Sequence, residues 1–186
     1  MNNMLLAFCL LFVACQSSKK QTSIANTITV AHINNRAISV DELKFYMSLE
    51  KANTVNYFFQ KHKAEVDQKF WNHSFDGEVP IAYLRHAAWD LLQKDQMIKQ
   101  SGLDHKLIAQ ADFAAFLTAM EGENKLRQQM IDEHKIVYGP TKFDRRGYYF
   151  YYMSQLENKL KHLGIVSFEK PLEITLDSVI FHQINL

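Results

Sequence analysis

The stretch from Pro80 to Leu103 constrains the fold more than any other part of the sequence. Its apolar residues recur mostly at steps of three and four, so they share one side of a helix: Ile81, Leu84, Ala88, Leu91, Leu92, Met97 and Ile98. Charged residues fall mostly outside this stripe: Arg85, Asp90, Lys94 and Lys99. Pro80 suits the first position of a helix, and Gly102 suits a left-handed stop at its end. The pattern predicts a long helix that packs against a core along one side.

A strand and the start of another helix are predicted earlier in the chain. The alternation of β-branched residues over Thr27–Ile33 is typical of a strand, and Asn34 with Asn35 favours a turn after it. Ser39 and Glu42 match a capping box, in which the serine hydroxyl accepts from the Glu42 amide and the carboxylate reaches back to the serine N–H. A helix is therefore expected to begin here.

Three more helical patterns follow, over Tyr57–Phe70, from near Asp104 with a weak point at Gly122, and over residues 145–163. Asp144 is the expected cap of the last one, and Gly164 its stop. The tail then changes character, because residues 171–176 alternate like a strand and residues 179–181 form a second β-like run. We expect one of these two runs to pair with the N-terminal strand. The fold class is mainly α, with about five helices and a short strand pair formed by the N- and C-terminal segments.

The N-terminus resembles an export signal. Residues Met4–Ala14 are an apolar run, too short for a spanning helix, which needs about 20 residues. The run ends in Phe-Val-Ala-Cys, which resembles a bacterial lipobox whose lipidated residue would be Cys15. The chain thus divides into a lipoprotein signal peptide at 1–14, a polar tether at 15–26 and a helical domain at 27–186. An ordinary cleaved signal peptide and a non-secreted chain remain the alternatives.

Lipidation at Cys15 implies a place in the cell. The domain would be held on a membrane of the cell envelope, facing the periplasm, with the inner or outer membrane left open. The only other cysteine is Cys9, so the body of the chain offers no disulfide, no thiolate metal site and no cysteine nucleophile.

Charge and motifs exclude several classes of function. The net charge of +1, without a long basic stripe, argues against nucleic acid as a partner. The eight histidines lack the paired spacing of metal ligands, and no nucleotide-binding or hydrolase motif occurs. We therefore expect no catalytic residue, no metal and no cofactor.

Several of these patterns together resemble a known family. An aromatic pair at Phe70 and Trp71, a short acidic glycine loop at residues 76–78, the helix that starts at Pro80 and a following helix with spaced phenylalanines are similar to the helical chaperone domain of SurA-like and PrsA-like foldases. The segment AHINNRAISVDEL resembles the way these foldases begin. The resemblance covers roughly residues 27 to 163. The tail after Leu163 is too short for a parvulin isomerase domain, so the resemblance implies binding rather than catalysis.

The run Tyr148-Tyr-Phe-Tyr-Tyr152 is the sharpest candidate binding feature. Five consecutive helical residues point around the whole circumference, so a helix packed on one side cannot bury all of them. We expect some of these rings, together with a second patch on an earlier helix, to contact clients: Tyr148, Tyr149, Tyr151, Tyr152, Tyr46 and Met47. Aromatic residues at helical spacing are also common in cores, and this alternative stays open.

The function indicated is that of an envelope-anchored chaperone that binds unfolded or extended segments of exported proteins. Its partners would be unfolded envelope or secreted polypeptides and, through the lipid, a membrane; a homodimer is also compatible with the sequence. The alternatives are a non-catalytic adaptor of one specific envelope complex and an enzyme of an unrecognised kind.

Overall fold

The computed structural model describes residues 28–168 and 171–186. In these residues the chain forms the following elements in order: β1 (Thr29–Ile33), β2 (Arg36–Ser39), α1 (Val40–His62), the 3-10 turn η1 (Phe70–Asn72), α2 (Pro80–Asp104), α3 (Phe113–Asp132), α4 (Arg145–His162), β3 (Ile174–Leu176) and α5 (Ser178–Gln183). The prediction of a mainly α fold is confirmed. The predicted signal peptide, tether and Cys15 lie outside the described residues. No helix in the described ranges is long and apolar enough to cross a membrane.

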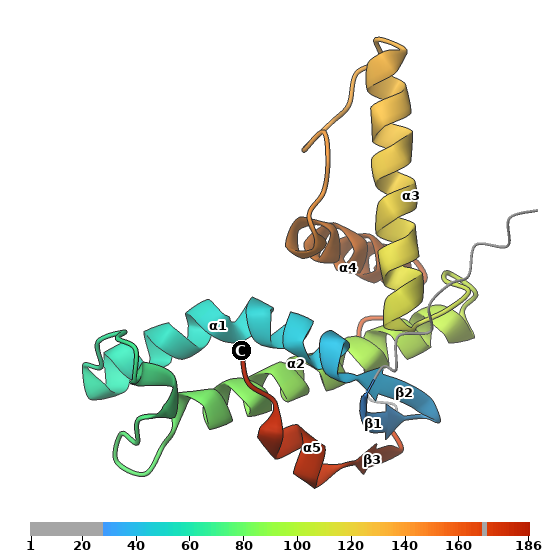
Figure 1. The fold of residues 1–186 in the computed structure, drawn as a ribbon. Coiled ribbons are helices and arrows are strands. Elements are labelled where there is room, and N and C mark those ends of the chain that lie inside the picture. Colours follow the sequence, from blue (N-terminus) through green and yellow to red (C-terminus); the bar gives the residue numbers. More distant parts are fainter. Residues whose placement is uncertain (1–27, 169–170) are drawn as a thin grey trace, which may run out of the picture.

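The long helices α1 and α2 lie side by side and form a platform, from whose end α3 projects as an arm (Figure 1). The chain turns at the tip of α3 and comes back to α4, which packs against α2. The tail, β3 and α5, runs along the side of the platform away from the arm (Figure 1). The helices thus form two parts, a two-helix platform and an arm that stands on one end of it.

A small sheet holds the two ends of the described chain together. β1 is the central strand, and it pairs antiparallel with β2 on one side and with β3 on the other. His32, for example, lies opposite both Ala37 and Thr175. The predicted pairing of the N- and C-terminal segments is therefore confirmed. Asn34 and Asn35 both have left-handed φ angles, 49° and 63°, as the turn between β1 and β2 requires.

The predicted helix ends are largely right because caps are local features. Pro80 is the first residue of α2, and the Ser39 hydroxyl accepts from the Glu42 amide at 3.0 Å. Asp144 caps α4 by accepting from the Gly147 amide at 2.7 Å, and Gly164 has a φ of 79°. Only half of the predicted capping box exists, since the Glu42 carboxylate points into the protein and accepts from Arg36 instead.

Two predicted helix boundaries are wrong. Residues 57–70 are not a second helix, because α1 continues unbroken to His62 and is capped by Lys63, whose φ is 54°. No glycine or proline interrupts residues 40–62, so apolar spacing alone could not separate one helix from two. The stop expected at Gly102 is also misplaced: α2 runs on to Asp104, and the left-handed residue is Lys106.

Gly102 does not end α2. Instead, it allows α2 and α4 to pack closely. A β-carbon at this position would lie 2.9 Å from the Leu156 side chain of α4. Its missing side chain therefore lets α4 approach α2. The weak point expected at Gly122 is not found, because α3 is continuous from Phe113 to Asp132.

The tail is fixed by one arginine and one phenylalanine. Arg85 donates from Nη1 to the carbonyl oxygens of His182 at 2.7 Å and Ile184 at 3.0 Å. Phe181 is 1% exposed and packs near Trp89 and His86. The β-like run predicted at 179–181 is thus a helical turn, with Asp177 as its cap. Arg85, expected on the solvent side of α2, is buried because it satisfies the last carbonyls of this tail.

The end of the platform farthest from the sheet has its own aromatic core and, beside it, a cluster of polar contacts around Glu78, which we call the Glu78 lock. Phe58, Ala64 and Phe70 are its fully buried members. Glu78, in the loop before α2, accepts hydrogen bonds from Tyr57 at 3.0 Å and Lys61 at 2.9 Å and lies 2.9 Å from the ring of His62. These contacts tie the last turns of α1 to the loop that leads into α2.

We expect this lock to weaken in acid. Hydrogen bonds from His62 and then Lys61 lower the pKa of the Glu78 carboxyl from 4.5 to about 2. A lowered folded-state pKa gives stability that is present above the usual value and is lost as the pH falls through about 2. The melting-temperature difference between the native chain and Glu78→Gln should therefore be largest above pH ~4.5 and shrink toward pH ~2. Glu121→Gln, on the exposed side of α3, is the control; an equal pH trend in both variants would contradict the lock.

Candidate functional site

The aromatic run of α4 divides between core and surface. Tyr148 and Tyr149 are 6% and 7% exposed, Tyr152 is half-buried, and Phe150 and Tyr151 are 51% and 37% exposed. The five consecutive rings are therefore not all buried, as the geometry of a helix packed on one side requires. The most exposed ring is Phe150, and two of the four tyrosines expected at the surface belong to the core.

The second expected patch is not on the surface. Tyr46 and Met47 are 1% and 0% exposed, so neither side chain offers area to a client in this structure. Tyr46 lies between α2 and α4, with its ring edge-on to Tyr149 at 6.0 Å. Tyr46 lies on a face of α1 that α2 and α4 cover, which the spacing in α1 alone could not reveal. Tyr46 instead belongs to a polar network that runs through the core.

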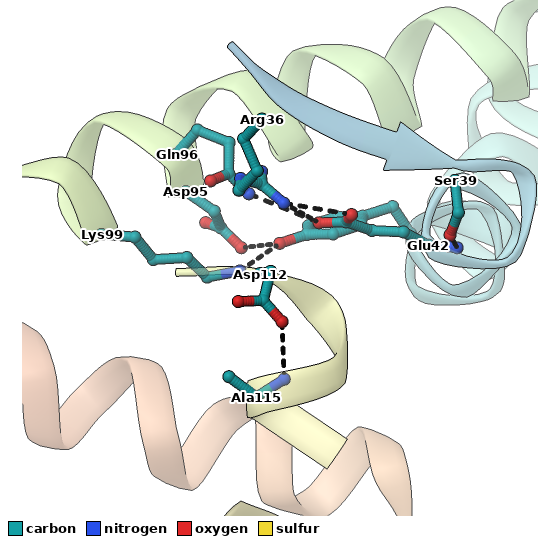
Figure 2. Close-up of polar contacts among 9 residues, drawn as sticks. Arg36, Ser39, Glu42, Asp95, Gln96, Lys99, Asp112 and Ala115 are labelled. Atoms are coloured by element: carbon teal, nitrogen blue, oxygen red, sulfur yellow. Dashed lines mark hydrogen bonds and ion pairs between the residues drawn. The ribbon is translucent and has the colours of Figure 1, made fainter. Parts of the chain in front are cut away.

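That network is the most unusual feature of the interior (Figure 2). Tyr46 donates its hydroxyl to Asp95 at 3.0 Å, and Lys99 donates to the Tyr46 oxygen at 3.4 Å. Glu42 accepts from both Nη1 of Arg36 at 3.3 Å and, more weakly, Nε2 of Gln96 at 3.5 Å. The carboxylates and the lysine are each less than 5% exposed. Charged groups are rarely buried this deeply unless they are paired.

The charges of the network stabilise one another. Burial raises the pKa of the Glu42 carboxyl, and the nearby Arg36 and Lys99 partly offset this rise. Burial likewise raises the pKa of Asp95, against which a hydrogen bond from Tyr149 and the charge of Lys99 act. The pKa of Lys99 is lowered by burial and held up by the two carboxylates. Removing one member would therefore leave its partners buried with less compensation of their charge.

The network joins the parts that position the arm. Its members come from β2, α1, α2 and, through Tyr149, α4. The first turn of α3 passes directly beside it, where Asp112 accepts from the Ala115 amide at 2.8 Å (Figure 2). The base of the arm is thus set against a rigid polar core.

Farther out, Arg127 orders the loop that follows α3. Its Nη1 donates to the carbonyl oxygens of Tyr138 at 3.0 Å and Pro140 at 2.7 Å. Its guanidinium lies 4.4 Å from the centre of the Phe143 ring, and Nε pairs with Glu123 at 2.9 Å. These contacts tie the loop around residues 138–140 to α3. Tyr138 and Ile136 stand out from it, 83% and 71% exposed.

An apolar hollow follows one face of α1. It has a volume of about 560 Å³ and a mainly apolar lining, and we call it the α1 groove; six residues of one helix face line it: Ser48, Lys51, Ala52, Val55, Asn56 and Phe59. Phe59 is 51% exposed here. The sequence places these residues in a helical pattern, but only the fold shows that all of them except the half-buried Val55 are exposed.

A second hollow continues the α1 groove toward the base of α4. Its lining comes from α1 and from the start of α4: Asp41, Lys44, Phe45, Ser48, Asp144, Arg145 and Arg146. The two hollows share Ser48, so together they form one surface along α1, which we call the trough. Arg146 fastens α4 beside it by donating to the Leu49 carbonyl at 3.4 Å. The trough is suited to binding a chain segment rather than to chemistry, since its polar groups do not converge on one point.

The sequence carries a signal of the buried network that was not among the predicted features. Asp95 and Lys99 continue the stripe of Ala88 and Leu92 in steps of three and four, and both are buried. Two opposite charges inside an apolar stripe indicate a paired polar core. In the described ranges, no group of three or more histidine, cysteine or carboxylate side chains is placed to hold a metal ion.

The chain is similar to one characterised chaperone. It is 31% identical over 123 residues, 64% of its length, to the chaperone for lacto-N-biosidase of Bifidobacterium longum subsp. longum. The match covers 44% of that protein, so this chain spans less than half the length of its relative. No protein-family model matches the chain, and no solved structure matches it significantly.

Proposed function

We propose that this protein is a dedicated chaperone that binds one exported client protein while the client folds. The similarity to a chaperone supports the general role. That relative is named for a single enzyme as its client, which favours one specific client over the many unfolded polypeptides expected from the sequence. The proposal keeps the expectation of binding without catalysis. It also keeps the lipid at Cys15, which would hold the chaperone where a client emerges from the membrane.

The observation that carries the proposal is the exposed apolar surface along α1. Contiguous exposed apolar surface on a folded domain often marks a binding site. Here the α1 groove presents Phe59 and the half-buried Val55 on a helix that the buried network and the aromatic core hold in place. A client segment would bury these side chains, and its affinity would be modest because the segment must become ordered.

The experiment compares the exported proteins of the native cells with and without this chain. We expect one exported protein to lose its soluble, active form in the deletion strain while its transcript stays unchanged. Loss of many exported proteins would instead favour a general holdase. A lasting stoichiometric complex with the folded protein would favour the adaptor, and an unchanged exported proteome would contradict the proposal. Cys15→Ser in the complementing chain should move it from the membrane to the soluble fraction.

A further inference from the structure

Basic side chains outnumber acidic ones around the trough. Four basic side chains line it: Lys44, Lys51, Arg145 and Arg146. The acidic residues that line it are Asp41 and Asp144. None of the six described residues that form the α1 groove is acidic. The trough therefore combines an apolar floor with a basic rim.

Both acids are already compensated at helix starts. Asp144 accepts from the Gly147 amide at 2.7 Å, and Asp41 lies in the first turn of α1. The partial positive charge of a helix N-terminus offsets a carboxylate in such a place. The basic groups are held differently: Lys51 lies 5.6 Å from the centre of the Trp71 ring, and Arg146 lies 5.3 Å from that of Phe150. These ring contacts orient the cations without neutralising them.

From this arrangement we propose that the trough binds an extended polypeptide segment whose large apolar side chains are flanked by acidic residues. The inference rests on the proposed function, for which it names the class of client segment. Apolar side chains would fill the α1 groove between Ala52 and Phe59, and the acidic side chains beside them would face Lys51 and Arg146. Charge complementarity of this kind selects the partner and speeds its association more than it adds affinity.

The length of the trough sets the length of the segment. From Asp41 to Phe59 a helix rises by roughly 27 Å, at about 1.5 Å per residue. An extended chain covers this distance in about eight residues, at about 3.3 Å each. A nine-residue probe is therefore long enough to contact both hollows.

The test uses three fluorescent nine-residue peptides with the same apolar centre and with flanks of glutamate, serine or lysine. Binding to the full chain is measured by anisotropy at low salt and at about 0.5 M salt, where screening is strong. We expect the glutamate peptide to bind about tenfold more tightly than the lysine peptide at low salt, and the difference to shrink at high salt. Equal binding of all three peptides, or binding of none, would overturn the inference.

Two variants locate the binding. Val55→Asp should lower the affinity for the glutamate peptide by about tenfold or more, since it places a carboxylate in the apolar floor. Lys44→Glu combined with Lys51→Glu should reverse the preference in favour of the lysine peptide. Lys125→Glu, an exposed change of the same kind on α3, is the matched control and should change nothing. Circular dichroism checks that each variant is folded, and unchanged peptide binding in a folded Val55→Asp chain would place the site elsewhere.

The outcomes separate this inference from the function on which it rests. If Val55→Asp restores the client in the deletion strain as well as the native chain does, the trough is not the site although the chaperone role stands. If peptides bind as expected but no exported protein depends on the chain, the chaperone role fails. A dimer of the native chain that Val55→Asp dissociates would show that a second copy covers the trough, which also overturns the inference.

Discussion

Replacement of Lys99 by methionine is expected to lower the free energy of unfolding by roughly 3–5 kcal/mol at pH 7. The change leaves the carboxylates of Glu42 and Asp95 in the core without the cation that faces both. Methionine is similar in length and apolar, so loss of packing contributes little. Urea unfolding followed by circular dichroism measures the difference. The matched control is Lys94→Met, an exposed position on the same helix, where we expect a change within about 0.5 kcal/mol.

The pH dependence of this deficit identifies its cause. Burial raises the folded-state pKa of Glu42 and Asp95, and without Lys99 both should rise further. A carboxyl with a raised folded-state pKa favours the folded state below its unfolded pKa, near 4, and this contribution is lost as the pH rises. The deficit of Lys99→Met should therefore shrink between pH 7 and about pH 4. A deficit that stays constant over this range would indicate a packing defect and contradict the electrostatic explanation.

Replacement of Phe58 by alanine is expected to cost about 3–5 kcal/mol in the free energy of unfolding. Phe58 is 0% exposed and is the centre of the aromatic core at the far end of the platform. Its ring lies 6.0 Å from that of Phe70, 5.6 Å from Phe75 and 5.7 Å from Tyr83. Truncation would leave a cavity between three segments that hold the ends of α1 and α2 together.

The adjacent residue is the natural control. Phe59 is 51% exposed and lines the α1 groove, so Phe59→Ala should change the free energy of unfolding by less than about 1 kcal/mol. The same variant should lower the affinity for the glutamate-flanked peptide, because it removes apolar contact area from the trough. Urea unfolding and anisotropy on both variants give the comparison. Equal losses of stability at the two positions would mean that Phe59 is covered in solution.

The local elements of this protein were determined by its sequence. Ser39 and Asp144 cap helices because their oxygens reach amides three residues away, and Pro80 starts α2 because its φ is already helical. Alternation along the chain also predicted β1 and the strand in the tail. Such features depend on neighbours along the chain, so no other part of the fold is needed to predict them.

The candidate site depended on which faces the fold covers. Tyr46, which was expected to contact clients, and Phe59 belong to the same helix, yet α2 and α4 bury the first and leave the second open. The aromatic run of α4 had to expose some rings, but the packing of that helix selected Phe150 and Tyr151. Lys99 continues the apolar stripe of α2, but only the fold places Glu42 from α1 beside it. Spacing along a helix tells which residues share a face, whereas burial and charge compensation arise from contacts between elements distant in sequence, and only the tertiary structure decides them.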